Sequence, residues 1–317
     1  MKLKIFSISA IILIALVIGF QISGNLVSKE KTIKIGYLQS LVSLPIFVAD
    51  ENKYLEKEGI KYELVKISSS EQVLESLLTN NIDLVFETSF VPILHAESKS
   101  PGNVKIFSVT DLTKDKPFDS LLVKGDSAIK ELKDLESKKI GVFPGTTSTN
   151  MLRHFLNFKN IDTKTIQFVQ IPPSGQLEAL SKGSVDALLS FEPNNAIAIK
   201  KLSAKRMFGS VFAEQINHNP QGVAVFSTRF VKENPELSKK VVSVFDKSVE
   251  FIRTREAETR QIISKRLKIE SDVVNSMTLF YMVKNNEVDK SKVQEYIDFL
   301  FELKEIERKV DVNEIIY

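Results

Sequence analysis

The sequence predicts an α/β protein of two lobes, each built on an open, mostly parallel sheet flanked by helices. The chain has 317 residues, which exceeds one small core and suits about two domains. Apolar, β-branched runs alternate with helix-like segments over short connections, as in sheets covered by helices on both faces. This alternation restarts near Lys116, so the chain divides into two halves of similar build.

The first half shows the alternation clearly, and its crossovers should be right-handed. The predicted elements are a strand at TIKIGYL (32–38), an amphipathic helix at LPIFVADENKYLEKEG (44–59), a strand at YELVKI (62–67), a helix at SEQVLESLLTN (70–80) and a strand at DLVFET (83–88).

The second half repeats the pattern. Its predicted elements are strands at 118–125, 139–143, 165–171 and 186–191 and helices at 129–138, 147–160 and 175–183. Ser70–Asp83 and Ser174–Asp186 also resemble each other, because each places a Leu-bearing helix, a polar turn and an Asp ahead of an apolar strand. Similar βα units share such features, so the echo supports two lobes of similar build without requiring a duplication.

The last part of the chain contains one strand, within GVAVFS (222–227), followed by several helices. One strand is too few for a third sheet, so this part should return to the first lobe. Lobe 1 is therefore predicted to comprise 33–114 and 220–317, and lobe 2 to comprise 115–219. The chain would cross between the lobes near 111–119 and near 213–222.

The N-terminal segment indicates export. Lys2 and Lys4 precede an uncharged apolar run from Ile5 to Phe20, as in a secretion signal or an uncleaved anchor. The positive-inside rule places the rest of the chain outside the cytoplasm. No A-x-A-like cleavage site follows, which favours a membrane anchor at 1–25 over a cleaved signal, with a polar linker at 26–32.

Composition and motifs argue against several functions. Lys and Arg (43) nearly balance Asp and Glu (40) without a long run of one sign, which argues against nucleic acid as a partner. The absence of cysteine excludes disulfides, thiolate metal sites, Cys nucleophiles and a lipid-modified cysteine. His95, His154 and His218 lack metal-ligand spacing, and the common catalytic motifs are absent. We therefore expect no catalytic residue, no metal and no cofactor, and we expect His154 on the exposed side of its helix.

Ligands of open α/β sheets bind at the carboxyl ends of the strands. Four polar strand-to-helix junctions fall there, at 39–43, 87–89, 144–149 and 191–195. Ordinary capping needs one hydroxyl, yet PGTTST (144–149) offers four, and the first acidic residue after Phe143 is Asp162. The open, positive end of this helix is therefore predicted to hold an anion or a polar ligand. Capping with incidental hydroxyls is the alternative.

Glu192 precedes Pro193, which favours an extended backbone and a helix start. In a cleft, its carboxylate would accept hydrogen bonds from an amine or a ring N–H. An exposed glutamate in a hinge is an equal alternative, and Glu87 carries the same ambiguity.

Five segments in order over residues 32–265 resemble the solute-binding proteins of ABC importers, in the nitrate/sulfonate/bicarbonate or thiamine-precursor (NMT1/THI5-like) subgroup. They are KIGYLQSLVSLPIFVADENKYLEKEGIKYELV, DLVFETSFVPILHA, KIGVFPGTTSTNMLRHFL, VDALLSFEPNNAIA and VAVFSTRFVKENPELSKKVV. The resemblance implies a two-lobed periplasmic-binding-protein fold (type II), an ABC permease with its ATPase as partner, and a monomer that closes on a small-molecule ligand.

The resemblance also implies the ligand contacts, which are Gln39, Ser40, Leu44, Glu87, Thr88, Ser89, Thr146, Thr147, Ser148, Glu192, Asn219 and Gln221. The chain has no Trp, so any ring stacking must come from phenylalanines, namely Phe47, Phe86, Phe90, Phe143 or Phe191. Related eukaryotic pyrimidine-synthesising enzymes resemble this fold as well, but they depend on a cysteine motif that this chain lacks.

Three functions remain at this stage: an anchored extracytoplasmic solute-binding protein, an enzyme on the same fold acting on a small pyrimidine-like metabolite, and a ligand-sensing ectodomain. The hydroxyl-rich junctions favour a ligand with acceptor atoms, whereas Glu87 and Glu192 favour donors. The sequence therefore points away from nitrate or a bare sulfonate and toward a solute with an amine or ring nitrogen.

Overall fold

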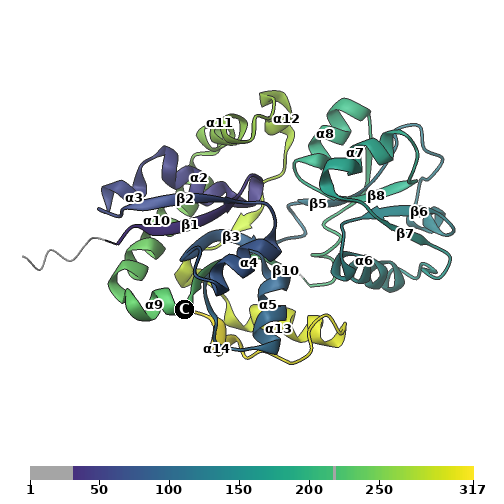
Figure 1. Cartoon of the computed structure of the whole chain (residues 1–317). Coiled ribbons are helices and arrows are strands. Elements are labelled where there is room, and N and C mark those ends of the chain that lie inside the picture. Colours follow the sequence, from purple (N-terminus) through teal and green to yellow (C-terminus); the bar gives the residue numbers. More distant parts are fainter. Residues whose placement is uncertain (1–30, 217–218) are drawn as a thin grey trace, which may run out of the picture.

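A computed structural model describes residues 31–216 and 219–317 and contains two sheets, each with its own helices (Figure 1). We call the part built on the six-stranded sheet lobe 1 and the part built on the five-stranded sheet lobe 2. The teal lobe 2 lies beside lobe 1, which contains both the purple start and the yellow end of the described chain. The two-lobed α/β fold is as predicted.

The sheet of lobe 1 has the order β11-β4-β10-β3-β1-β2. Its parallel part, β2-β1-β3, arises from successive βα units, while β10 runs antiparallel to both β3 and β4 because the chain re-enters from the other lobe. The strands are β1 (Ile33–Leu38), β2 (Tyr62–Ile67), β3 (Leu84–Ser89), β4 (Val104–Leu112), β10 (Asn219–Ser227) and β11 (Tyr281–Met282).

The sheet of lobe 2 has the order β7-β6-β8-β5-β9. Here β6 is parallel to β7 and β8, whereas β5 is antiparallel to β8 and β9. Both sheets are therefore mixed rather than mostly parallel as predicted, because only the strands of successive βα units pair in parallel. The strands are β5 (Asp119–Val123), β6 (Lys139–Val142), β7 (Gln167–Gln170), β8 (Ala187–Phe191) and β9 (Lys205–Gly209).

Helices flank both sheets (Figure 1). Those of lobe 1 are α2 (Leu44–Glu51), α3 (Tyr54–Lys57), α4 (Ser70–Leu78), α5 (Phe90–Lys99), α9 (Thr228–Glu233), α10 (Pro235–Thr254), α11 (Glu256–Leu267), α12 (Ser271–Ser276), α13 (Lys290–Glu302) and α14 (Val312–Ile315). Those of lobe 2 are α6 (Thr146–Phe158), α7 (Pro173–Ser181) and α8 (Asn194–Leu202). Short 3-10 turns are η1 (Leu41–Ser43), η2 (Leu132–Leu135) and η3 (Asn285–Glu287).

Two predicted helices differ from the structure. The helix at 44–59 is divided into α2 and α3, because Lys53 adopts a left-handed backbone (φ 54°). The helix at 129–138 is only the turn η2, where the Asp134 carboxylate accepts the N–H groups of Lys130 (2.7 Å) and Glu131 (3.1 Å) and closes a short loop. Strands β4, β9 and β11 were not among the predicted elements.

The echo between Ser70–Asp83 and Ser174–Asp186 has a physical counterpart. Asp83 accepts the N–H of Lys34 at 2.9 Å, and Asp186 accepts the N–H of Lys139 at 2.8 Å. Each aspartate donates its own N–H to the carbonyl of the same lysine, at 2.8 Å in both cases. The two lobes thus align their central parallel strands with the same side-chain device.

Two segments connect the sheets, and Asp119 ties them together. Its Oδ2 accepts the N–H of Phe212 at 3.0 Å, and its carbonyl accepts the N–H of Ser210 at 2.9 Å. Ser210 Oγ in turn donates to the carbonyl of Thr113 at 3.0 Å. Complete burial raises the pKa of Asp119 to about 6, against the opposing effect of the backbone N–H donors.

Among residues 31–216 and 219–317, no helix combines the length and apolar character needed to cross a bilayer. The predicted anchor at 1–25 lies outside these residues, as does most of the predicted linker at 26–32.

Candidate functional site: the cavity between the lobes

A cavity of about 440 Å³ lies between the lobes, within the size range of small-ligand sites. It is reached by the ends of four strands: β1 leads to Ser40, β3 to Ser89, β6 to Phe143 and β8 to Phe191. These are carboxyl ends, where open α/β sheets bind ligands. Residues from both lobes line the cavity, so a bound molecule would contact both.

The wall from lobe 1 carries most of the polar atoms. Glu87, at the end of β3, is 2% exposed, and its Oε2 accepts a 2.8 Å hydrogen bond from Thr110 Oγ1. Oε1 has no hydrogen-bond partner among the described residues and lies against Gly222, where an added Cβ would come within 1.6 Å of it. Only glycine therefore leaves room for this carboxyl group.

The carboxyl group of Glu87 is in an unfavourable place for a charge. Burial raises the pKa of Glu87 well above its ordinary range. The Thr110 hydrogen bond lowers this pKa, while the neighbouring Asp111 carboxylate on β4 raises it again. No cation among the described residues is among the groups that offset this burial.

Thr88 lies beside Glu87 and is 1% exposed, yet its hydroxyl has no hydrogen-bond partner among the residues that the structure describes. A buried polar group without a partner is uncommon and lowers stability. Ser89 and Ser40 precede α5 and η1 without capping them through their side chains. Gln221, on β10, donates to Tyr296 Oη at 2.8 Å. Lobe 1 therefore presents hydroxyl and carboxyl groups that its own fold does not fully use.

The wall from lobe 2 is mainly aromatic. The rings of Phe143 and Phe191 meet edge to face at 4.9 Å. Phe118, from the first interlobe segment, packs at 6.1 Å from Phe191 and at 4.9 Å from Phe280 of lobe 1. These rings give the cavity an apolar side suited to the body of an organic molecule.

Glu192 lies at the same wall, but its acceptors are already occupied. Its Oε2 accepts the N–H of Ala196 in α8 at 3.0 Å, and its Oε1 accepts the N–H of Thr278 in lobe 1 at 3.2 Å. Burial raises its pKa, and these two backbone donors oppose that effect. The residue is 5% exposed, so the alternative of an exposed hinge glutamate is wrong. Glu192 joins the lobes and caps α8.

The hydroxyl-rich start of α6 differs from the prediction of an open helix end. Glu305, which follows α13 in lobe 1, accepts hydrogen bonds from Thr147 Oγ1 (2.8 Å), Thr146 Oγ1 (3.3 Å) and Asn150 Nδ2 (2.5 Å). Ser148 Oγ donates to the carbonyl of Phe143 at 2.8 Å. An acidic residue distant in sequence thus occupies the place that the local sequence left without one. Any ligand bound there would have to displace Glu305.

Six of the predicted contact residues line the cavity, and six do not. Those in the lining are Ser40, Glu87, Thr88, Ser89, Glu192 and Gln221. Gln39 is exposed and donates to the carbonyl of Arg266 at 2.6 Å, Leu44 is 1% exposed in the core, and Asn219 is fully buried and donates to the carbonyl of Phe212. Thr146, Thr147 and Ser148 make the contacts described above. Direct contact of any of these residues with a ligand stays a prediction.

The sequence also suggested phenylalanines for stacking. Phe143 and Phe191 line the cavity, whereas Phe47, Phe86 and Phe90 belong to the core of lobe 1.

Sequence reasoning missed Thr110, Phe118, Gly222 and Phe280 in the lining. A glycine inside a strand, as at Gly222, signals close approach of another group. No feature of the neighbouring sequence indicates that Phe280 lines the cavity, because it lies in a segment that follows several helices.

The histidines do not contribute to the cavity. His95 and His154 are exposed, as expected for His154, whose Nδ1 lies 2.7 Å from Gln215 Oε1. His218 lies outside the described residues. Within the described part of the chain, no group of His, Asp or Glu has an arrangement that would hold a metal ion.

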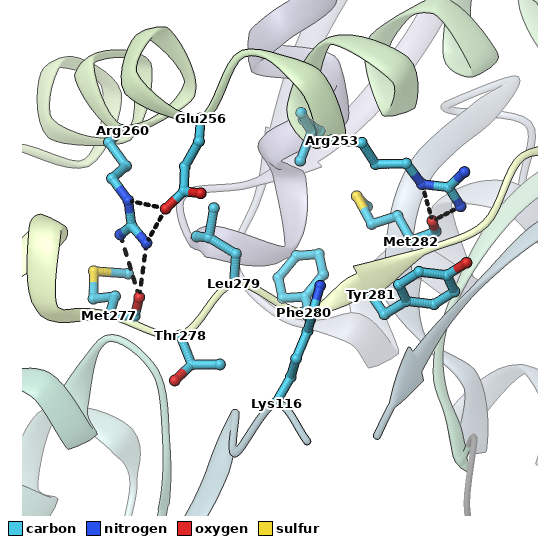
Figure 2. A pocket seen from close by; sticks show the side chains of 11 residues that line it. Lys116, Arg253, Glu256, Arg260, Met277, Thr278, Leu279, Phe280, Tyr281 and Met282 are labelled. Atoms are coloured by element: carbon cyan, nitrogen blue, oxygen red, sulfur yellow. Dashed lines mark hydrogen bonds and ion pairs between the residues drawn. The ribbon is translucent and has the colours of Figure 1, made fainter. Parts of the chain in front are cut away.

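A second cavity, of about 340 Å³, lies next to the segment 277–282 (Figure 2). Its two arginines are engaged with backbone carbonyls and acids. Arg260 donates to the carbonyl of Met277 at 3.2 Å and to Glu256 at 2.9 Å, and Arg253 donates to the carbonyl of Met282 and to Glu287. These arginines therefore brace the segment that carries Phe280 into the first cavity.

A cavity between two α/β lobes, lined by strand ends from both, is the architecture of the periplasmic-binding-protein fold. The chain belongs to the NMT1-like family, whose model matches residues 27–268. A curated relative is the "putative aliphatic sulfonates-binding protein" of Bacillus subtilis (strain 168), 26% identical over 298 residues that cover 90% of this chain and 86% of the relative.

Solved structures share the fold. The periplasmic aliphatic sulphonate binding protein SsuA from Escherichia coli superposes with a TM-score of 0.76 at 21% identity, covering 92% of each chain. The desulfurization enzyme DSZB superposes with a TM-score of 0.69 at 17% identity, covering 90% of this chain and 96% of its own. The fold alone therefore does not separate binding proteins from enzymes.

Proposed function

We propose that this protein is the solute-binding component of an ABC importer and captures a small organic solute by closure of its two lobes. It delivers the solute to a membrane permease that works with an ATPase, and it acts outside the cytoplasm as a monomer attached through its N-terminal segment. The similar proteins from Bacillus subtilis and Escherichia coli, both named as binding proteins, support this function.

The observation that carries the proposal is the composition of the cavity. Lobe 1 contributes polar atoms that have no partner in the described part of the chain, above all the hydroxyl of Thr88, and lobe 2 contributes aromatic rings. Each lobe alone offers half of a site, so the ligand should bind the closed arrangement more tightly than the open one. This difference in binding free energy is what drives closure.

We further infer that the solute leaves unchanged. Glu192 has both oxygens engaged by backbone N–H groups, and the binding proteins named above support this inference. A ligand-sensing role would require a signalling partner on another chain.

The test is a thermal-shift screen of the full chain against sulfonates, nitrate, bicarbonate, pyrimidines and amino acids. A true ligand at 100 times its Kd should stabilise the fold by about 2.7 kcal/mol, and mass spectrometry should recover it unaltered. A well-folded protein that responds to none of these compounds would contradict the proposal. Recovery of a converted product would favour an enzyme instead.

A further inference from the structure

The described lining of the cavity between the lobes contains acidic side chains and no basic ones. Glu87 and Glu192 contribute to its lining, and within the described residues no Lys, Arg or His does. Glu192 has both oxygens engaged by backbone N–H groups. Glu87 is therefore the acidic group with an oxygen available to a ligand.

The oxygen Oε1 of Glu87 is held in place from several sides. Thr110 fixes the other oxygen at 2.8 Å, and the absence of a side chain at Gly222 admits the carboxyl group. The carboxyl group is positioned before any ligand arrives, so binding needs little reorganisation of it. Thr88 adds its unpartnered hydroxyl next to it in the chain.

Charge decides which ligands suit this arrangement. A sulfonate bound here would leave water without meeting a cation, which is unfavourable for a buried anion. An ammonium or N–H group would instead give Oε1 the donor it lacks. Phe118, Phe143, Phe191 and Phe280 would surround the apolar body of the ligand, and an aromatic face also attracts a cation.

We propose that Glu87 determines the specificity of this cavity, which takes uncharged or cationic organic solutes that present an N–H or ammonium group to Glu87 Oε1, in preference to sulfonates. The inference rests on the proposed function. It assigns this chain a class of ligand that differs from the sulfonates in its relatives' names.

The two ligand classes have opposite effects on the proton of Glu87. An ammonium group beside the carboxyl group favours its ionised form, so binding releases a proton at pH values below the raised pKa of Glu87. A sulfonate would favour the protonated form and release none. The charged or polar groups around Glu87 include Asp111 and Thr110 on β4, Gln221 on β10 beside the uncharged Gly222, its chain neighbours Thr88 and Ser89, and Glu192 across the cavity. Glu192 is paired at 3.8 Å with Arg206, which does not itself line the cavity. No described residue of the lining supplies a positive charge.

Calorimetric titration of the full chain with matched probes tests the inference. The probes are benzylamine and benzenesulfonate, and butylamine and butanesulfonate, each titrated in buffers of different ionisation enthalpy. We expect each amine to bind at least tenfold more tightly than its sulfonate and to release protons. Glu87→Gln should lower amine affinity about tenfold and abolish the proton release.

Glu97→Gln is the matched control. Glu97 is a buried carboxylate of lobe 1, 1% exposed, whose oxygens accept the N–H groups of Gly102 and Asn103 away from the cavity. This variant should keep the amine affinity, even where it loses stability. The proton release of the unmodified chain supplies a second readout that does not depend on the folding of Glu87→Gln.

Tighter binding of the sulfonates, without proton release, would overturn the inference and leave the proposed function standing. Failure of all four probes to bind would also overturn it. Only the added failure of the wider thermal-shift screen would contradict the proposed function.

Discussion

The two walls of the cavity differ in what their polar side chains do. On the wall of lobe 1, the hydroxyl of Thr88 and the Oε1 of Glu87 have no hydrogen-bond partner within residues 31–216 and 219–317. On the side of lobe 2, Glu192 accepts two backbone N–H groups, and Thr147 donates to Glu305 across the interface. In the described lining, lobe 1 leaves polar atoms without partners, whereas Glu192 of lobe 2 joins the lobes and Phe143 and Phe191 offer rings to the cavity.

This difference shows that polar residues at strand ends have two separate uses. A polar atom with partners on both lobes stabilises closure, and a polar atom without a partner is available for binding. Lys201 of α8 also pairs with Glu270 of lobe 1 at 2.5 Å, which adds a surface contact between the two lobes. The following variants test this division, beginning with the largest expected change in free energy.

Glu192→Ala should cause the largest loss. It removes an acceptor that satisfies the N–H groups of Ala196 and Thr278, and each buried donor left without a partner costs about 1–3 kcal/mol. We expect the free energy of unfolding to fall by about 3 kcal/mol, measured by urea denaturation. Glu178→Ala, which removes only an exposed pair with Lys182, should change it by under about 0.5 kcal/mol. Equal effects of the two variants would show that Glu192 is not a structural joint.

Glu305→Ala should act on closure rather than on folding. Its three donors come from the other lobe and regain water when the lobes separate, so the closed arrangement should lose about 1–3 kcal/mol relative to the open one. Small-angle X-ray scattering should record a larger radius of gyration without ligand.

Thr147→Ala should shift closure in the same direction by a smaller amount, because it removes one of these bonds. Glu307→Ala, which breaks an exposed contact with Lys99, is the control and should leave the radius unchanged. An unchanged radius of gyration for Glu305→Ala would show that these hydrogen bonds do not hold the lobes closed. The start of α6 would then again be a candidate ligand contact.

Thr88→Val should have the smallest effect on stability. The substitution keeps the shape and removes a buried hydroxyl without a partner, so the free energy of unfolding should stay the same or rise by up to about 1 kcal/mol. Ligand affinity should fall roughly tenfold, a loss of about 1.4 kcal/mol. Thr259→Val removes an equally buried, unpartnered hydroxyl on α11 and should leave affinity unchanged in titration calorimetry. Retained affinity in Thr88→Val would mean that this hydroxyl does not contact the ligand.

The sequence by itself determined the two-lobed α/β architecture and the strand ends at which the cavity lies. These features follow from short-range patterns, since apolar alternation and turn residues act over a few positions. The aspartates Asp83 and Asp186, which align the central strands of the two lobes, were visible as a sequence echo for the same reason.

Tertiary structure decided which polar groups remain available for a ligand. The start of α6 was left without an acid by its own sequence, and Glu305 supplies one from 158 residues beyond Thr147. Phe280 reaches the cavity from a segment that is also distant in sequence from the strand ends. Gly222, on β10, leaves the space that the carboxyl group of Glu87 on β3 occupies. A hydrogen bond between groups so distant depends on how the lobes pack, which no local pattern encodes.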